Sequence, residues 1–334
     1  MLFSAKTYYF SLKPNKIVTG GTAYFCGGMS SSPTYRTDSK KYNISSDAVT
    51  AGPSIVTGTG STASGFNNGK LGFTAFGNGT TGLLGPAQTA SGSDNVAANI
   101  SNRSIKITIS TDATAAATNL AVGWRFSSGT TDGIRGVKMG GYYTTNSGAA
   151  CVNIIQKYLW SSDAWATSTP TLANNIMLAG IHGNAEFAYR ASGHNEQATS
   201  ANILYANKWI WSSDTLRSIS SVLDEQMGYA SCTGNQENVV IMAGLNSAGA
   251  IISRVKSIIM LTDTRTNQTA LSAGILGNAD AAGADDFGIF NFDRGTSGAT
   301  RKYNYSADTH AAGTNLIASV SIQGTGAFHS SQIS

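Results

Sequence analysis

The sequence predicts an all-β protein built from about six copies of one short unit. Only 12% of the 334 residues are charged, 38 are Gly, and stretches of Ser, Thr, Ala and Asn separate short apolar runs. Many short strands joined by many turns produce such a composition. No window of useful length has helical periodicity, because Gly and β-branched residues interrupt each candidate.

The repeating unit contains a strand of alternating apolar residues that ends in small polar residues and an Asp. An aliphatic residue follows eight or nine positions later and opens another strand. The successive aspartates are 65, 51, 51, 49 and 45 residues apart, which indicates an underlying period of about 50. These aspartates are Asp47, Asp112, Asp163, Asp214, Asp263 and Asp308.

A second element, an apolar strand that ends at Gly, lies upstream of each Asp. Each repeat therefore has at least three strands, and we expect four. The long first interval contains residues 79–102, rich in Gly, Ser, Ala and Asn, which we interpret as a loop inserted into the second repeat. The copies of the second element are Ala23–Gly28, Leu71–Gly77, Gly136–Gly141, Glu186–Gly193, Val239–Gly244 and Phe287–Gly295.

Sheets of three or four short strands cannot bury both faces alone, so consecutive copies must pack on one another. Rotation around an axis then gives a β-propeller of about six four-stranded blades in one domain, residues 22–334. A β-solenoid is an alternative, but its coils need roughly 20 to 30 residues. Seven blades are a second alternative if residues 1–21 belong to another unit. We expect residues 1–21 to form a strand that closes the ring or an arm that docks on a neighbouring subunit.

The blades resemble the kelch repeat, as found in kelch-type and galactose-oxidase-like propellers. The resemblance rests on the period, on the Gly27–Gly28 and Gly140–Gly141 pairs, and on the aromatic-x-aromatic strand before Asp. It implies kelch-like blades over almost the whole chain. Copper chemistry of the galactose-oxidase type would need Tyr and His ligands with a nearby Cys, a set that we cannot place on these blades. The resemblance therefore implies fold and not activity.

The recurrent Asp is interpreted as a turn residue rather than as a catalytic or calcium-binding group, because Asp side chains accept backbone N–H bonds in turns. Pairs of aromatic residues precede three of these turns, and residues at i and i+2 point to one face of a strand. We expect the rings to pack between blades; a sugar-stacking platform is the alternative. The pairs are Tyr158/Trp160, Trp209/Trp211 and Tyr303/Tyr305.

Residues able to bind metal are few. The chain has four histidines, of which His182 and His194 lie 12 apart with Glu196 nearby, but a third convincing ligand is lacking. The sequence therefore predicts neither a metal nor another cofactor. The other two histidines are His310 and His329.

Two further groups of reactive residue types also have a structural interpretation. The adjacent carboxylates Asp224/Glu225 and Asp285/Asp286 are expected in solvated loops rather than as paired glycosidase acids. The three cysteines are widely separated and odd in number, so we expect buried thiols in strands. They are Cys26, Cys151 and Cys232.

Charge and hydropathy argue against two classes of partner. The formal charge is +4, but Lys and Arg are scattered singly, so no stripe for nucleic acid is predicted. The N-terminus has no long apolar stretch before a cleavage site, and no segment approaches 18 apolar residues. We expect neither signal-dependent export nor membrane insertion.

These features predict a non-catalytic structural or adhesive binding module within a larger assembly or homo-oligomer. Low charge, abundant small polar residues and the absent signal resemble phage virion proteins such as tail-fibre or baseplate components. The expected location is a virion or extracellular surface, and the expected partners are other structural proteins or a surface glycan. The alternatives are a carbohydrate-active or copper-dependent oxidase, and a cytoplasmic kelch-type adaptor. The sequence identifies no ligand-contacting residue.

Overall fold

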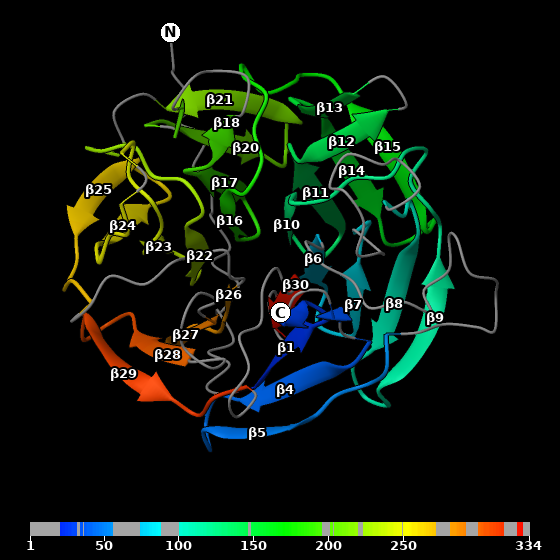
Figure 1. Cartoon of the computed structure of the whole chain (residues 1–334), viewed down its shortest axis with the longest axis horizontal. Helices are drawn as coiled ribbons and strands as arrows, with labels where there is room; N and C mark the ends of the chain where they lie inside the picture. Colours follow the sequence, from blue (N-terminus) through cyan, green and yellow to red (C-terminus); the bar gives the residue numbers. More distant parts are fainter. Residues whose placement is uncertain are drawn as a thin grey trace, which may run out of the picture.

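The computed structural model is a six-bladed β-propeller in which each blade is a four-stranded antiparallel sheet (Figure 1). It describes residues 21–31, 34–35, 37–55, 74–87, 100–145, 148–195, 201–202, 204–219, 223–248, 250–271, 281–291, 300–316 and 326–329. No helix capable of crossing a membrane occurs within these ranges. The expected fold class is confirmed, and the solenoid and the seven-bladed ring are excluded for the described residues.

The inner strand of each blade lies next to the propeller axis, and neighbouring inner strands contact one another around the ring (Figure 1). In blades 1 to 6 the inner strands are β30 (Gly326–His329), β6 (Ala75–Gly77), β10 (Ser128–Thr131), β16 (Gly180–Gly183), β22 (Ser231–Gly234) and β26 (Ala281–Gly283). The second strands are β1 (Thr22–Cys26), β7 (Thr81–Leu84), β11 (Arg135–Met139), β17 (Phe187–Ala191), β23 (Asn238–Met242) and β27 (Phe287–Asn291).

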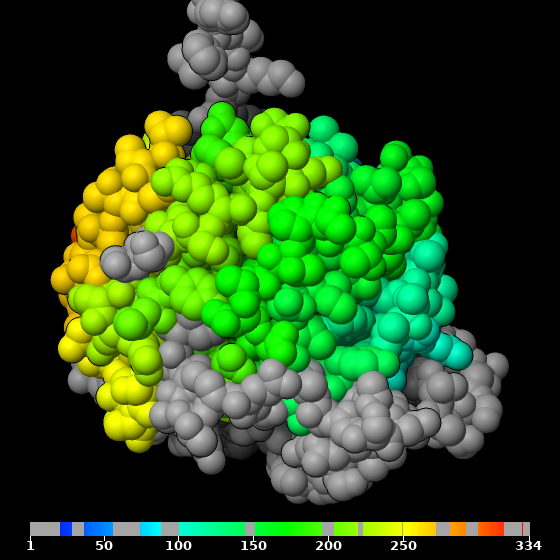
Figure 2. Space-filling model, turned by 90° about the horizontal axis from the view of Figure 1, so that it is seen from above, coloured from blue at the N-terminus to red at the C-terminus, as the bar shows by residue number. Residues whose placement is uncertain are grey.

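The third and outer strands complete each sheet, and the outer strands form the rim of the disc. The third strands are β4 (Ser39–Asn43), β8 (Ser104–Thr108), β14 (Ile155–Leu159), β20 (Ala206–Ile210), β24 (Val255–Ile259) and β28 (Thr300–Asn304). The outer strands are β5 (Ala48–Ala51), β9 (Ala113–Ala117), β15 (Ala164–Ser168), β21 (Thr215–Ile219), β25 (Thr264–Asn267) and β29 (Thr309–Gly313). Figure 2 shows the disc from the side, where the green and yellow segments of blades 3 to 5 lie side by side.

The ring is closed by the C-terminal strand. Strand β30 pairs with β1, with His329 opposite Ala23 and Gly326 opposite Cys26. Blade 1 thus combines three strands from the start of the described chain with one from its end. Residues 1–20 lie outside the described residues, so the prediction for the N-terminal arm is not tested.

Blade 2 corrects one sequence assignment. The segment Leu71–Gly77 was expected to be equivalent to the Gly-ended strands of the other repeats, which are second strands, but its described part supplies the inner strand β6. The second strand is instead β7, which lies inside the stretch 79–102 that we expected to be a loop. The pairing of β7 with β8 defines this position, because Thr81 lies opposite Thr108. Residues 88–99 of that stretch lie outside the described residues.

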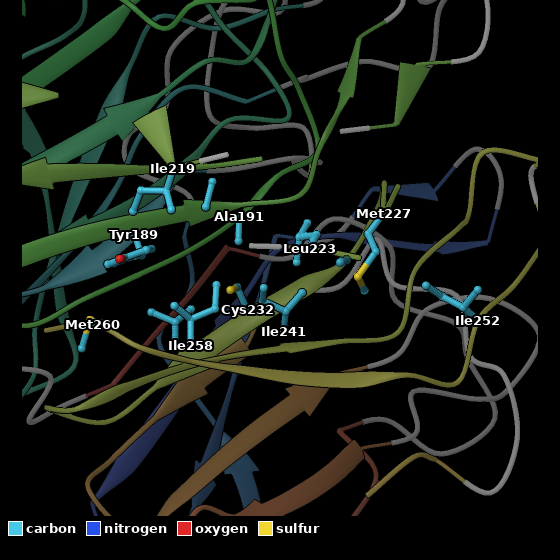
Figure 3. Close-up of a cluster of buried hydrophobic side chains, with 13 residues drawn as sticks. Tyr189, Ala191, Ile219, Leu223, Met227, Cys232, Ile241, Ile252, Ile258 and Met260 are labelled. Atoms are coloured by element: carbon cyan, nitrogen blue, oxygen red, sulfur yellow. The ribbon is translucent and has the colours of Figure 1, made fainter. Parts of the chain in front are cut away.

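Each of the six interfaces between blades contains one cluster of buried apolar side chains. Figure 3 shows the cluster between blades 4 and 5, where Tyr189 and Ala191 of β17 meet Cys232, Ile241 and Ile258 of blade 5. Successive side chains of each second strand point to opposite faces of the sheet. Alternate side chains therefore pack against the preceding blade and the following blade. Each blade is therefore buried on both faces. The three cysteines lie buried in β1, in β13 (Gly148–Cys151) and in β22, as expected.

Close to the axis, a side chain of one blade lies over a glycine of the next. Phe76 of blade 2 packs on Gly129 and Gly136 of blade 3, and a Cβ at Gly136 would lie 2.7 Å from Phe76 Cδ2. Likewise a Cβ at Gly234 would lie 2.7 Å from His182 Cδ2 of the preceding blade. These glycines permit the close approach of backbones that a tight ring requires.

We expect Gly136→Ala to lower the free energy of unfolding by about 1–3 kcal/mol, because the added methyl overpacks the Phe76 ring. On a Phe76→Leu background the same substitution should cost less, since the smaller side chain leaves room. Urea unfolding of the two single variants and the double variant measures this coupling. Equal costs in both backgrounds would contradict the contact.

Candidate functional site

The two faces of the disc are built differently. On the turn face, tight turns join the inner to the second strands and the third to the outer strands. On the hairpin face, longer connections join the second to the third strands and each outer strand to the next blade. Among the described residues, three of these connections contain two-stranded hairpins, and β12–β13 overlies blade 3 in Figure 1. The hairpins are β2 (Met29–Ser31) with β3 (Thr34–Tyr35), β12 (Tyr142–Thr145) with β13 (Gly148–Cys151), and β18 (His194–Asn195) with β19 (Ala201–Asn202).

All six recurrent aspartates lie on the turn face, each directly before the first residue of an outer strand. Each has a left-handed backbone, with φ between 49° and 59°. Asp tolerates this conformation better than most residues, because its short polar side chain forms local hydrogen bonds. The left-handed backbone agrees with the interpretation of the aspartates as turn residues. The backbone amides that bind three of the carboxylates, however, belong to the preceding blade: Thr118 donates to Asp163, Thr269 to Asp308 and Thr314 to Asp47.

The aspartates also join neighbouring blades, which the sequence interpretation missed. A lysine at the middle of the third strand reaches the Asp turn of the next blade in four cases. Lys41 Nζ lies 2.5 Å from Asp112, and Lys106 Nζ lies 2.8 Å from Asp163. The other two pairs are Lys157–Asp214 at 2.6 Å and Lys208–Asp263 at 2.9 Å.

The last two interfaces use variants of this contact. Ser257 occupies the lysine position in blade 5, and the amide and hydroxyl of Thr269 bind Asp308 instead. Lys302 of blade 6 donates to the backbone carbonyl of Ile44, in the turn that contains Asp47. A signal was present in the sequence, because in five of six repeats a Lys lies six residues before the Asp.

The ion pairs differ in their electrostatics. Partial burial works to raise the pKa of Asp163, but hydrogen bonds from Lys106, Tyr158 and the amide of Thr118 hold it below its ordinary value. Between blades 4 and 5, burial raises the pKa of Asp263 and lowers that of Lys208. Desolvation thus offsets part of the attraction in the more buried pair.

The other sequence candidates lie apart from one another. His182 is buried in β16, where Nε2 lies 3.0 Å from the carbonyl oxygen of Asn235 and burial lowers its pKa to about 4. The ring of His194 packs against Tyr229 on the hairpin face, at 5.5 Å between centroids. Glu196 lies outside the described residues. Within the described ranges, no three metal-ligating side chains come together.

The remaining candidates make structural contacts. Lys256 donates to Asp224, and this hydrogen bond lowers the pKa of Asp224. Arg254 lies 3.0 Å from Glu225, so the adjacent carboxylates have separate partners. Asp285 and Asp286 lie in the turn between β26 and β27. The rings of Tyr158, Trp209, Trp211 and Tyr303 are buried between blades, as expected for packing.

The hairpin face has a feature that the sequence did not indicate. Phe126, Leu178 and Tyr229 each lie two residues before the inner strand of blade 3, 4 or 5, and each has a left-handed backbone, with φ of 54°, 52° and 58°. Bulky residues seldom adopt this conformation. All three side chains are partly exposed, and their place before the inner strands puts them near the axis. We call these three residues the axial arc.

Hydrogen bonds hold the axial arc in place. The amide of Leu178 donates to the carbonyl of Phe126 at 3.0 Å, which links blades 3 and 4. The residue before each member of the arc forms a β-bridge with the next hairpin or loop, and backbone hydrogen bonds run in both directions. The bridges are Arg125–Tyr142, Met177–His194 and Gly228–Leu245. The axial arc is therefore part of a fixed backbone framework.

A buried cation lies beneath this framework. Lys138 of β11 is fully buried; its Nζ donates to the carbonyl of Gly140 at 3.0 Å and lies 4.1 Å from the centroid of the Trp124 ring. Burial lowers the pKa of Lys138 to about 7. A carbonyl and an aromatic face replace water poorly for an ammonium group, so Lys138 is a source of instability when charged.

Comparison with known proteins supports the fold alone. A solved structure titled "Structure of YjhT" is similar, with a TM-score of 0.60 and 10% sequence identity, over 74% of this chain and 84% of that chain. No protein-family model matches the sequence. A search of curated proteins also found no match.

Asp163→Asn should lower the free energy of unfolding by about 0.5–1 kcal/mol near pH 7, since Asn retains the left-handed turn and loses the charge. The pKa of Asp163 is depressed in the folded state, so its contribution is present above the ordinary Asp pKa and disappears as the pH falls through the lowered value. Urea unfolding at pH 7 and below pH 3 measures this. An equal loss at both pH values would contradict the ion-pair assignment; Asp163→Ala, which also strains the turn, should cost more.

Lys138→Met should stabilise the protein at pH 7 by several kcal/mol. Because the pKa of Lys138 is lower in the folded state, the wild type should gain stability as the pH rises from about 7 to about 10.5, and the advantage of the Met variant should shrink over that window. Unfolding curves at pH 7 and 10 provide the test. Lys106→Met, which breaks an ion pair, is the control and should destabilise. A Lys138→Met variant less stable than wild type at both pH values would refute the argument.

Proposed function

We propose that this chain is a non-catalytic structural or adhesive module that binds its partner through the hairpin face. The observation that carries the proposal is the axial arc. A left-handed backbone at a non-Gly residue costs of the order of 1–3 kcal/mol and is typical of functional sites. Here this strain recurs at three equivalent positions, each of which carries a large apolar side chain.

The arc is suited to recognition because it is fixed before a partner arrives. A preorganised surface loses little conformational entropy on binding. Large, partly exposed aromatic and aliphatic side chains are typical centres of protein interfaces. A protein partner is therefore favoured. A surface glycan is the second partner class, supported by the partly exposed ring of Tyr143, whose centroid lies 5.5 Å from that of Trp124.

The location and the finer family belong to the same proposal. Low charge and abundant small polar residues support a place in a virion or on a cell surface, such as a phage tail fibre or baseplate. Kelch-type blades are supported by the positive φ angles of both residues in the Gly27–Gly28 and Gly140–Gly141 pairs. Each pair ends a second strand and turns the chain into a hairpin.

The test replaces Phe126, Leu178 and Tyr229 together with Gly, which adopts the left-handed backbone without strain. Partner binding should be lost, while stability should stay within about 1 kcal/mol per site, because strain relief offsets lost packing. Binding of labelled protein to purified surface or particle proteins and to a glycan panel is the measurement. Ala115→Asp, on the exposed outer strand β9, is the control and should bind normally. Unchanged binding by the triple variant, or a stoichiometric transition metal in the purified protein, would overturn the proposal.

A further inference from the structure

The two faces of one molecule have complementary features. The axial arc lies on the hairpin face, where it offers apolar side chains from blades 3, 4 and 5. On the turn face, Ile134 of blade 3 and Leu261 of blade 5 are 72% and 73% exposed, which is unusual for such large apolar residues. Both faces therefore carry apolar side chains that a contact between molecules would bury.

The described chain begins on the turn face. The carbonyl of Gly21 accepts a hydrogen bond from the amide of Ile44, in the turn that contains Asp47, and Thr22 lies opposite Asn43. Strand β1 runs from there to the hairpin face. The described chain therefore begins, at Gly21, on the side of the disc opposite to the axial arc.

The N-terminal segment, residues 1–20, has the composition and length to act as a ligand. Residues 1–12 contain seven large apolar or aromatic residues, which are Met1, Leu2, Phe3, Tyr8, Tyr9, Phe10 and Leu12. Twenty extended residues reach about 66 Å, whereas a five-residue strand crosses only about 17 Å. A second copy stacked on the turn face would present its axial arc directly to this segment.

We propose that the N-terminal segment of one copy binds the axial arc of a second copy, so that the chains stack head to tail. This inference rests on the proposed function, because it uses the same surface and identifies its partner as this chain. Such a contact is heterologous: the turn face and arm of one copy meet the hairpin face of the next. It also covers Ile134 and Leu261, which are largely exposed in the described part of a single ring.

The sharpest test is complementation between two full-length variants. Phe10→Asp should disable the arm and Leu178→Asp should disable the arc, so each alone should be monomeric by light scattering at concentrations where the wild type associates. An equimolar mixture should form 1:1 dimers, because the Leu178→Asp variant supplies an intact arm and the Phe10→Asp variant supplies an intact arc.

The matched control for the arm is Ser11→Asp and that for the arc is Ala115→Asp; both should associate as the wild type does. Thermal unfolding checks that Leu178→Asp retains the ring.

A peptide experiment keeps the test independent of Leu178→Asp folding. A synthetic peptide of residues 1–20 should bind the chain truncated to 22–334, in which all four strands of every blade are retained. It should bind the triple Gly variant of the arc at least tenfold more weakly, and the peptide carrying Phe10→Asp should also lose at least tenfold in affinity. Leu261→Asp in the full chain should weaken association several-fold.

A wild-type chain that stays monomeric at all concentrations, a peptide that does not bind, or variants that fail to complement would each overturn head-to-tail stacking. If stacking fails but the triple Gly variant loses binding to a partner other than this chain, the proposed function stands and only the stacking is wrong. If the triple Gly variant retains all foreign partners and the peptide does not bind, both proposals fail. Dimers that form equally well without residues 1–20 would assign the interface to another surface and would also overturn the inference.

Discussion

The packing of each blade between its two neighbours is the constraint on which this structure depends. A sheet of four short strands has two faces to bury, and the closed ring buries both faces of every blade. The apolar clusters supply most of the driving force, but they are not directional. The contact from Lys106 to the Asp163 turn, and its counterparts, is directional, and it fixes one blade relative to the next at the outer part of the turn face. Glycines such as Gly136 set the spacing at the axis.

The sequence predicted the parts of the fold that repeat. The Asp-terminated strand, the period and the strand that ends at Gly identified the blades, because each repeat must satisfy the same local requirements of turn and burial. Blade 2 was assigned incorrectly because β6 ends at Gly77 and β7 is followed directly by Gly85, and only the pairing of β7 with β8 distinguishes the two strands. Strand β30 could not be assigned to blade 1 because sequence periodicity does not show which strand pairs with an edge some 300 residues away.

The candidate site was predictable only in part. The aspartates were found because they recur, but their partners were missed because each lysine contacts a turn of the following blade rather than its own. The axial arc has no common residue type: Phe126, Leu178 and Tyr229 share a backbone conformation, and a left-handed φ at a bulky residue leaves no local pattern. Such strain is imposed by tertiary hydrogen bonds. Here these bonds join the residue before each member of the arc to a hairpin or loop on the same face. The site therefore emerges from the assembled ring.

The closure of blade 1 by β30 has a consequence for synthesis in the cell. Strands β1, β4 and β5 leave the ribosome first, yet the inner edge of β1 stays open until residues 326–329 have been made. At ordinary translation rates that wait is about 15 to 60 seconds. During this time an exposed edge can pair with another nascent chain, which is a known route to aggregation. Blades 2 to 6 each contain all four of their strands in one continuous segment, so the first blade to be translated is the last to be completed.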